Sequence, residues 1–393
     1  MKMRFDKLGL VIAPLLCGAL FAPFATYRAN RIVAGEGKSI LAATSPLPGF
    51  AYTGELLIIL LLSLAILALL RNGAQLRLLA AIGGLIGLGV AVGLAGIALT
   101  LAGSTFCRVS PASGFWVALL ALFILFADAA VRLRLTPLAR LAGVVIAGAV
   151  LTGFLWSGLW SDLSVLKEFA NRAGNFWHEA ATHLLLALGS LAAAIATGLP
   201  LGIAIERRPK LRGPVLNMLN VVQTIPSIAL FGMLIAPLAW LATTVPALGS
   251  AGINGIGFAP AFIALFLYSL LPMTANTLIG LTQVPRDVVD AARGMGFSAR
   301  QLLFEVELPL AFTVILTGIR IVLVQNIGLA AIAALIGGGG FGVFIFQGIS
   351  QTATDLILLG TIPTVVLALG AAVVMDAVIE FSAKMDVRGK AIA

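Results

Sequence analysis

The sequence predicts an all-α, polytopic membrane protein with about ten transmembrane helices. Hydrophobic residues make up 60% of its 393 residues and charged residues only 10%. The mean hydropathy is +1.09. Apolar runs of about 20 residues recur along the chain, which is the length that a helix needs to cross a hydrocarbon layer of roughly 30 Å. The 43 glycines suit helices that pack closely in lipid.

The predicted spans are ten apolar runs, here in chain order: 8–26, 51–70, 77–103, 114–132, 138–160, 183–205, 214–241, 257–281, 309–335 and 356–381. The first run has two interpretations, because MKMRFDK followed by LGLVIAPLLCGALFAPFAT also resembles a secretory signal peptide. No A-x-A cleavage site follows this run and the next polar loop is short, which favours an uncleaved span.

The basic residues predict that both termini lie in the cytoplasm. If the chain starts inside and its spans alternate, 18 Lys and Arg residues fall on the cytoplasmic side and 6 on the other side. This excess agrees with the positive-inside rule. The net charge of +9 is therefore a topology signal and does not indicate a nucleic-acid partner.

The spacing of the spans predicts three regions. Residues 1–160 hold five spans joined by short loops. Residues 161–182, SDLSVLKEFANRAGNFWHEAAT, form a polar, amphipathic connector on the outer side. Residues 183–393 hold five further spans and, at 286–309, a charged segment between two of them.

Two glycine-rich stretches partly match nucleotide-binding motifs but lack residues or neighbouring elements that those motifs need. GEGKS at 35–39 lacks the first glycine of a phosphate-binding loop, because that position holds Ile32. GGGGFG at 337–342 matches G-x-G-x-x-G but comes after a membrane span and not after a strand of a βαβ unit, so a bend at the outer end of a span is the better interpretation.

No catalytic or metal constellation stands out. His178 and His183 have only Glu179 nearby, so solvated or interfacial histidines are expected there. Cys17 lies in an apolar run and Cys107 in a polar loop, which argues against a disulfide between them. We therefore predict no metal, no cofactor and no enzymatic activity in this chain.

The segment DAARGMGFSARQLLFEVELP at 290–309 predicts a helix–turn–helix hairpin at the cytoplasmic membrane surface. Its first part favours a helix, which Gly294 and Gly296 break. Ser298 can cap a second helix, and Pro309 suits the start of the next span. An ordinary amphipathic interfacial loop is the alternative interpretation.

The spacing within this segment resembles the cytoplasmic coupling motif of ABC-importer permeases, E-A-A, three residues, G, nine residues, I-x-L-P. Every interval of the motif is kept, with Asp for Glu and Val for Ile as mild departures. The resemblance implies a segment that docks into a groove on a separate ATPase subunit. The residues that it assigns to coupling are Asp290, Ala291, Ala292, Arg293, Gly296, Val306, Leu308 and Pro309.

The resemblance extends to the permeases of osmoprotectant importers, which move quaternary amines such as glycine betaine, choline and carnitine. It is carried by NVVQTIPSIALFGMLI (220–235), by 264–296 and by 318–349, and it covers about 175–385. It implies a type I ABC-importer permease core of about five spans in the C-terminal half. The subset that resembles a low-affinity betaine system has a similar N-terminal membrane extension.

The resemblance also implies partners and a location. We expect two ATPase subunits, a second permease subunit that is identical or related, and a separate periplasmic or surface substrate-binding protein, because the chain ends soon after its last span with KMDVRGKAIA. The expected location is the bacterial inner membrane, with the lipid bilayer as solvent.

Polar residues inside the spans are candidates for the translocation path, with hydrogen bonding between helices as the alternative. They are Gln223, Thr224, Pro226, Ser227, Tyr268, Asn276, Gln325 and Asn326. Pro226 is expected to break a span and free backbone groups at depth. Arg320 can reach the cytoplasmic interface or pair with Asp376 or Glu380.

Three alternative functions remain open. A secondary transporter run by an ion gradient would need carboxylates inside the membrane, of which the spans are nearly bare. A membrane-embedded enzyme would need a catalytic constellation. Within the importer class, a permease for an amino acid or another small solute is the nearest alternative.

Overall fold

The computed structural model describes residues 6–31, 33–44, 52–100 and 106–392. The chain divides into two compact units, which are described separately. Unit 1 comprises Met1–Asn171 with Ala353–Asp355, and unit 2 comprises Arg172–Thr352 with Leu356–Ala393. The first residue of the predicted span 51–70, residues 101–103 of the span 77–103, and residues 1–5 of the possible signal peptide lie outside the described residues.

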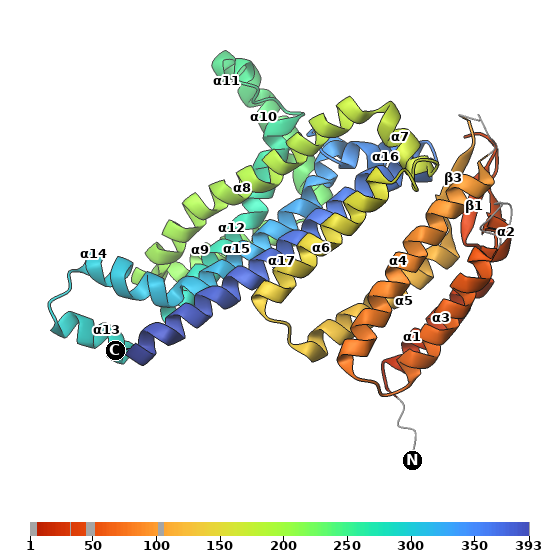
Figure 1. The fold of residues 1–393 in the computed structure, drawn as a ribbon. Helices are drawn as coiled ribbons and strands as arrows, with labels where there is room; N and C mark the ends of the chain where they lie inside the picture. The colour runs from red at the N-terminus through yellow and green to blue at the C-terminus, as the bar shows by residue number, and fades with distance from the viewer. Residues whose placement is uncertain (1–5, 32, 45–51, 101–105, 393) are drawn as a thin grey trace. The chain divides into compact units, whose positions relative to one another are not determined.

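Unit 1 is a helical bundle with a small sheet at one end (Figure 1). Its longer helices are α1 (Gly9–Phe21), α3 (Thr53–Leu69), α4 (Ala74–Leu99), α5 (Ser113–Leu133) and α6 (Pro137–Trp156), and its short helices are α2 (Ile40–Thr44) and α7 (Ser164–Asn171). Helices α1, α3, α4 and α5 enclose an apolar core that includes Leu16, Leu61, Leu88 and Leu122.

The small sheet is a local exception to the predicted all-α fold. Strand β1 (Ala25–Arg28) is central and pairs antiparallel with both β2 (Glu36–Lys38) and β3 (Arg108–Pro111). Strands β2 and β3 come from polar segments between apolar runs, whereas β1 begins within the last two residues of the predicted run 8–26. Strands of three or four residues carry almost no period-2 signal, so the sequence pattern alone did not indicate them.

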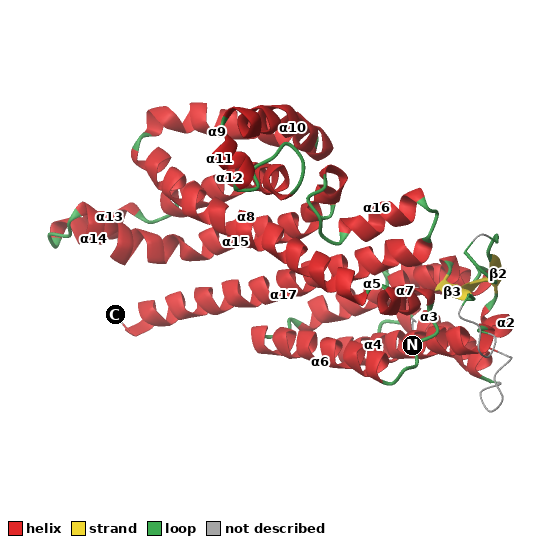
Figure 2. Cartoon of the chain, turned by 90° about the horizontal axis from the view of Figure 1, so that it is seen from above, coloured by secondary structure: helices red, strands yellow, loops and turns green. Residues whose placement is uncertain are grey.

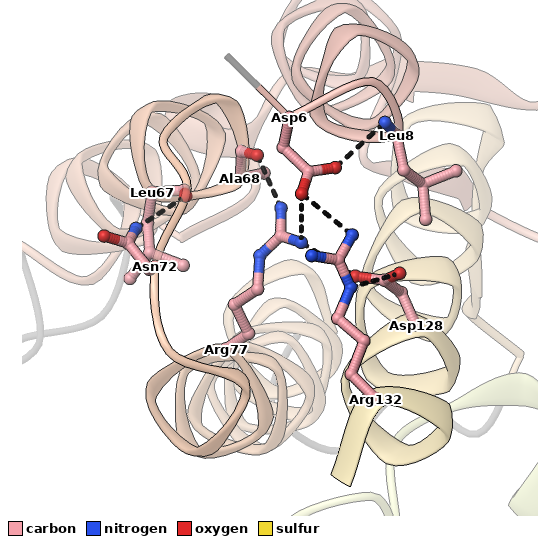
Figure 3. A network of polar contacts seen from close by, with 8 residues as sticks. All are labelled: Asp6, Leu8, Leu67, Ala68, Asn72, Arg77, Asp128 and Arg132. Atoms are coloured by element: carbon pink, nitrogen blue, oxygen red, sulfur yellow. Dashed lines mark hydrogen bonds and ion pairs between the residues drawn. The ribbon is translucent and has the colours of Figure 1, made fainter. Parts of the chain in front are cut away.

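A buried group of charges, which we call the Asp6 network, holds one end of unit 1 together (Figure 3). Arg77 is fully buried in α4, and its Nη1 lies 3.1 Å from Asp6 Oδ2 and 2.8 Å from Asp128 Oδ2. Arg132 Nη2 lies 2.8 Å from Asp6 Oδ2. Burial alone would raise the pKa of Asp6, but the hydrogen bonds from Arg132 and the Leu8 N–H, with the charge of Arg77, lower it below its ordinary value of 3.8.

Unit 2 is a bundle of long helices from which a hairpin and a shorter helical arm project (Figures 1 and 2). Its elements are α8 (Ala173–Arg207), α9 (Pro209–Thr224), α10 (Ser227–Thr244), α11 (Pro246–Ser250), α12 (Phe258–Thr282), α13 (Arg286–Gly294), α14 (Ala299–Gln301), the π-helical turn η1 (Leu302–Glu307), α15 (Leu308–Ala330), the 3₁₀ turn η2 (Ile332–Ile336), α16 (Gly342–Ser350) and α17 (Thr354–Ile392), whose first residues Thr354 and Asp355 are counted in unit 1.

Helix α12 packs extensively against both α8 and α15 and forms the centre of unit 2. The approach of α8 is close because Gly202 faces Thr277, where an added Cβ would lie 2.6 Å from the Thr277 Cβ. Side chains from all three helices, including Leu191, Met273 and Ile315, fill one apolar cluster. Small residues at the contact therefore set the spacing of the helices that carry the candidate site.

The polytopic architecture predicted from the sequence is confirmed. Among the described residues, eight helices are long and apolar enough to cross a membrane, and α1 and α3 are shorter apolar helices. Each of these ten helices overlaps one of the ten predicted runs, although several ends differ: α1 stops at Phe21, and α8 starts at Ala173. The break predicted at Pro226 is present: the run 214–241 is divided between α9 and α10, because Pro226 cannot supply the N–H that a continuous helix needs.

The predicted connector 161–182 is wrong in its second half. Residues 164–171 form the separate helix α7, but α8 begins at Ala173 and continues for 35 residues. The first turns of α8 are polar but consist of residues compatible with a helix. The change from polar to apolar residues near 183 therefore does not coincide with the start of the helix.

Candidate coupling hairpin and polar cluster of unit 2

The first arm of the hairpin is α13, and its end explains why a glycine stands at 296. Gly296 has φ +88°, its N–H donates to the Arg293 carbonyl at 2.9 Å, and the Phe297 N–H donates to the Ala292 carbonyl at 3.2 Å. This pair of bonds is the Schellman motif, which requires a left-handed residue after the helix. No atom lies within 4 Å of a Cβ added to Gly296, so the space beside the turn is open.

The second arm begins at Ser298 as predicted, but it is not a separate helix. The Ser298 hydroxyl accepts from the Gln301 N–H at 3.3 Å, and the Gln301 side chain accepts from the Ser298 N–H at 3.0 Å, which completes a capping box. The helix then runs without interruption from α14 through η1 into α15. Pro309 stands in the first turn of α15, directly after the π-helical turn η1.

The hairpin has a buried side and an exposed side. Ala292, Leu302 and Glu307 are buried, and Val306 and Leu308 are half-buried. Asp290, Ala291, Arg293, Gly296 and Pro309 are exposed. Most of the predicted coupling residues therefore face away from unit 2.

The charges on the exposed side are only loosely paired. Arg293 Nη1 lies 3.6 Å from Asp290 Oδ1, with 61% and 71% of the two side chains exposed. Arg300 lies over the ring of Phe304, 6.0 Å from its centroid. Exposed pairs of this kind contribute little to stability and remain accessible to other groups.

Glu307 forms an ion pair that sequence reasoning missed. Arg207, the last residue of α8, donates from Nη1 to Glu307 Oε1 at 3.1 Å and from Nη2 to Oε2. Only 8% of the Glu307 side chain is exposed, against 36% of Arg207. The two residues are 100 positions apart in the sequence, so no local pattern links them.

Three of the predicted path residues meet at the backbone of α12. Gln223 and Gln325 each donate from Nε2 to the Tyr268 carbonyl, at 2.8 and 3.4 Å. That carbonyl lacks its helical partner because residue 272, four positions on, is a proline. The Tyr268 hydroxyl in turn donates to the carbonyl of Ile225, at the break before α10. A proline within α12 and the break before α10 thus free the carbonyls of one polar cluster, to which α9, α12 and α15 contribute side chains.

The remaining path candidates make other hydrogen bonds or lie at the break before α10. Asn326 is fully buried and bonds to Ser190 at 2.8 Å and to Ser269 at 3.0 Å. Asn276 donates to the Pro272 carbonyl of its own helix at 2.8 Å. Thr224 bonds within α9, while Pro226 and Ser227 begin α10. Asn326 matches the alternative interpretation, hydrogen bonding between helices.

The structure also shows the partner of Arg320 and the burial of His183. Arg320 pairs with Asp376, since its Nε lies 2.8 Å from Asp376 Oδ1, and Glu380 lies 2.9 Å from Lys384. The expectation of a solvated or interfacial His183 is wrong. Its side chain is fully buried, and its Nδ1 lies 3.4 Å from the Phe341 N–H, just after the glycine bend at 337–340. His178 is exposed.

Two protein-family models match the chain. The model described as "ABC transporter permease YehY, N-terminal domain" matches residues 6–166, and the model described as "Binding-protein-dependent transport system inner membrane component" matches residues 194–384.

Characterised relatives match the second half. The carnitine transport permease protein OpuCB of Listeria monocytogenes is 38% identical over 206 residues, which are 52% of this chain and 87% of the relative. The osmoprotectant import permease protein OsmW of Salmonella typhimurium is 42% identical over 187 residues, 48% of this chain and 82% of the relative. The glycine betaine/carnitine/choline transport system permease protein OpuCB of Bacillus subtilis is 35% identical over 196 residues, 50% of this chain and 83% of the relative.

Among solved structures, an inward-facing conformation of the MetNI methionine ABC transporter is similar with a TM-score of 0.46 and 21% identity. The match covers 54% of this chain and 98% of the other.

Proposed function

Because this chain belongs to the family of permease subunits of osmoprotectant ABC importers, we propose that it imports a quaternary amine such as glycine betaine, choline or carnitine. Three similar relatives carry these compounds, or osmoprotectants as a class, in their names. The chain is a non-catalytic membrane subunit in this proposal, and a separate ATPase subunit hydrolyses ATP.

The observation that carries the proposal is the exposed hairpin formed by α13, α14 and η1 (Figure 1). The first arm ends in a Schellman motif, and the second arm begins with a capping box. The exposed residues around Gly296 leave room for another surface to approach. A short, well-capped helix set into a partner groove transmits a rigid-body displacement. The coupling residues are those that the motif assigned, Asp290 to Arg293, Gly296, Val306, Leu308 and Pro309.

The complete importer has further components. Two ATPase subunits dock at the hairpins of two permease subunits, which are two copies of this chain or this chain and a relative. A separate binding protein delivers the solute on the opposite side of the membrane. The excess of basic residues in alternate loops supports a bacterial inner-membrane protein with both termini in the cytoplasm.

The polar cluster around Tyr268 is the part of unit 2 best suited to line the path. Gln223 and Gln325 use their amide N–H groups on the Tyr268 carbonyl, which leaves their side-chain oxygens as weak acceptors. A quaternary ammonium has no N–H to donate, so it passes most readily along weak dipoles and aromatic faces. Pro226, Ser227, Thr224 and Asn276 flank this cluster in the proposal, and Asn326 holds the helices together.

Uptake of radiolabelled glycine betaine tests the proposal. The chain is expressed in a host without osmoprotectant uptake, together with its binding protein, with and without its ATPase subunit. Uptake that requires the ATPase is the expected result. Uptake without the ATPase would instead support a secondary transporter, and ATPase-dependent uptake of an amino acid but not of a quaternary amine would reassign the substrate.

Two substitutions at one position separate docking from folding. Gly296→Asn adds bulk to the open side of the turn, while asparagine tolerates a positive φ. Gly296→Ala adds little bulk but strains the turn by about 1–2 kcal/mol. If the hairpin docks closely, the Asn variant loses uptake and the Ala variant keeps most of it. Normal uptake with Gly296→Asn would contradict close docking.

A further inference from the structure

A directional contact, the ion pair between Arg207 and Glu307, joins the end of α8 to the base of the hairpin. The two guanidinium nitrogens face the two carboxylate oxygens, with Nη1 3.1 Å from Oε1. A bidentate pair of this kind fixes orientation as well as distance. Arg207 is also the last residue of α8, where the helix dipole favours a cation.

Glu307 occupies a particular point of the coupling segment. It stands between Val306 and Leu308, at the end of the π-helical turn η1 and directly before α15. A π turn holds an extra residue, and one residue in a helix with 3.6 residues per turn rotates the rest of that helix by about 100°. Because the second arm continues into α15, a displacement of this arm is transmitted to α15 through this turn.

Apolar contacts also hold the base of the hairpin. Leu303 and Leu308 pack against the cluster that includes Leu191 of α8 and Met273 of α12. Apolar contacts are non-directional, so they hold the arm against the bundle but permit small sliding movements. The ion pair adds the direction that these contacts lack.

We propose that Arg207 and Glu307 are positioning residues for energy coupling, which link displacement of the hairpin to α8. Helix α8 packs extensively on α12, the helix that carries Tyr268 and the polar cluster. The mechanical route is therefore from the hairpin to Glu307, to Arg207, along α8 and into α12. This inference rests on the proposed function, since it requires an ATPase subunit at the hairpin.

The test measures glycine betaine taken up per ATP hydrolysed, with the complete importer in proteoliposomes. Glu307→Gln removes the carboxylate charge with little change of shape, and Arg207→Lys keeps the charge but loses the planar fork. Both variants are expected to lower the ratio by about five-fold or more, the lower end of ordinary coupling between sites. The ATPase subunit still co-purifies with both. Exchange of the two residues, Arg207→Glu with Glu307→Arg, is expected to recover much of the ratio.

Arg208→Lys is the matched control, because Arg208 is the exposed neighbour of Arg207. Its ratio stays at the wild-type value. If Glu307→Gln does not accumulate, Arg207→Lys and the exchanged pair supply the same measurement. A purely structural pair would lower the amount of complex and leave the ratio unchanged, which overturns the inference alone. A wild-type chain that binds no ATPase subunit overturns the docking function, and the coupling role with it.

Discussion

The Asp6 network of unit 1 and the hairpin of unit 2 hold similar charges in opposite environments. In the network, the Arg77 side chain is fully buried and only 5% of the Asp6 side chain is exposed. In the hairpin, 61% of Arg293 and 71% of Asp290 are exposed, and their charged atoms are 3.6 Å apart. The charged groups of the network pair with one another inside unit 1, whereas those of the hairpin stay exposed to contact by another molecule.

This difference shows that charge in an apolar chain has two uses. A buried arginine must have its partners in the same fold, because an unpaired buried ion is very costly. An exposed, weakly paired arginine contributes little to stability. We therefore expect it to contact a partner protein. The comparison predicts a large stability effect in the network and a small one in the hairpin.

Arg77→Met is the substitution expected to have the largest effect. It leaves the carboxylates of Asp6 and Asp128 to share Arg132 and removes the buried cation between them, and breaking a buried ion pair costs about 3–5 kcal/mol. Chemical unfolding of the purified chain in detergent measures the loss. The control is Arg71→Met at a nearby exposed arginine, which should change the free energy of unfolding by less than about 0.5 kcal/mol. Equal effects of the two substitutions would contradict the role of the network.

Asp6→Asn should have an intermediate effect, on the order of 2 kcal/mol, because the charged hydrogen bonds from Arg132 and the Leu8 N–H are weakened. The folded-state pKa of Asp6 is lowered, so its contribution is fully present above pH 3.8 and is lost as the pH falls through the folded pKa. Unfolding curves from pH 3 upward should therefore converge for the wild type and the variant at acid pH. Parallel curves at every pH would argue against this linkage.

Arg293→Gln should have the smallest effect on stability, below about 0.5 kcal/mol, because its pair with Asp290 is exposed and separated by 3.6 Å. Co-purification of the ATPase subunit at increasing salt concentration tests for a docking role. The variant should lose the ATPase subunit at a lower salt concentration than the wild type. A destabilisation as large as that of Arg77→Met would remove the contrast between the two regions.

Much of the fold was predictable because its signals are local. The length of each apolar run indicated the helices, and the ten predicted runs overlap helices of the described chain. Gly296 and Ser298 marked the turn of the hairpin for local reasons, a left-handed backbone and a helix cap. The break at Pro226 was expected from the fixed proline ring, and the structure has it between α9 and α10.

The candidate site was predictable only in part. The spacing from Asp290 to Pro309 pointed to the hairpin, but the π turn η1 has no sequence signal and made the second arm continuous with α15. Pro272 could have been noticed, because a proline frees the carbonyl four residues earlier, and that carbonyl is where Gln223 and Gln325 meet. His183 was misjudged because polarity at a helix start does not reveal which side faces the bundle.

The sequence by itself determined that this is a multi-spanning helical protein with a capped, charged hairpin between two spans. Those features depend on apolar length, glycine conformation and capping chemistry, which act over a few neighbouring residues. Only the tertiary structure decided which charges find partners. Asp6 meets Arg77 across 71 positions and Arg207 meets Glu307 across 100. Pairing over such separations depends on how whole helices pack, and helix packing is set by the summed shape of many side chains.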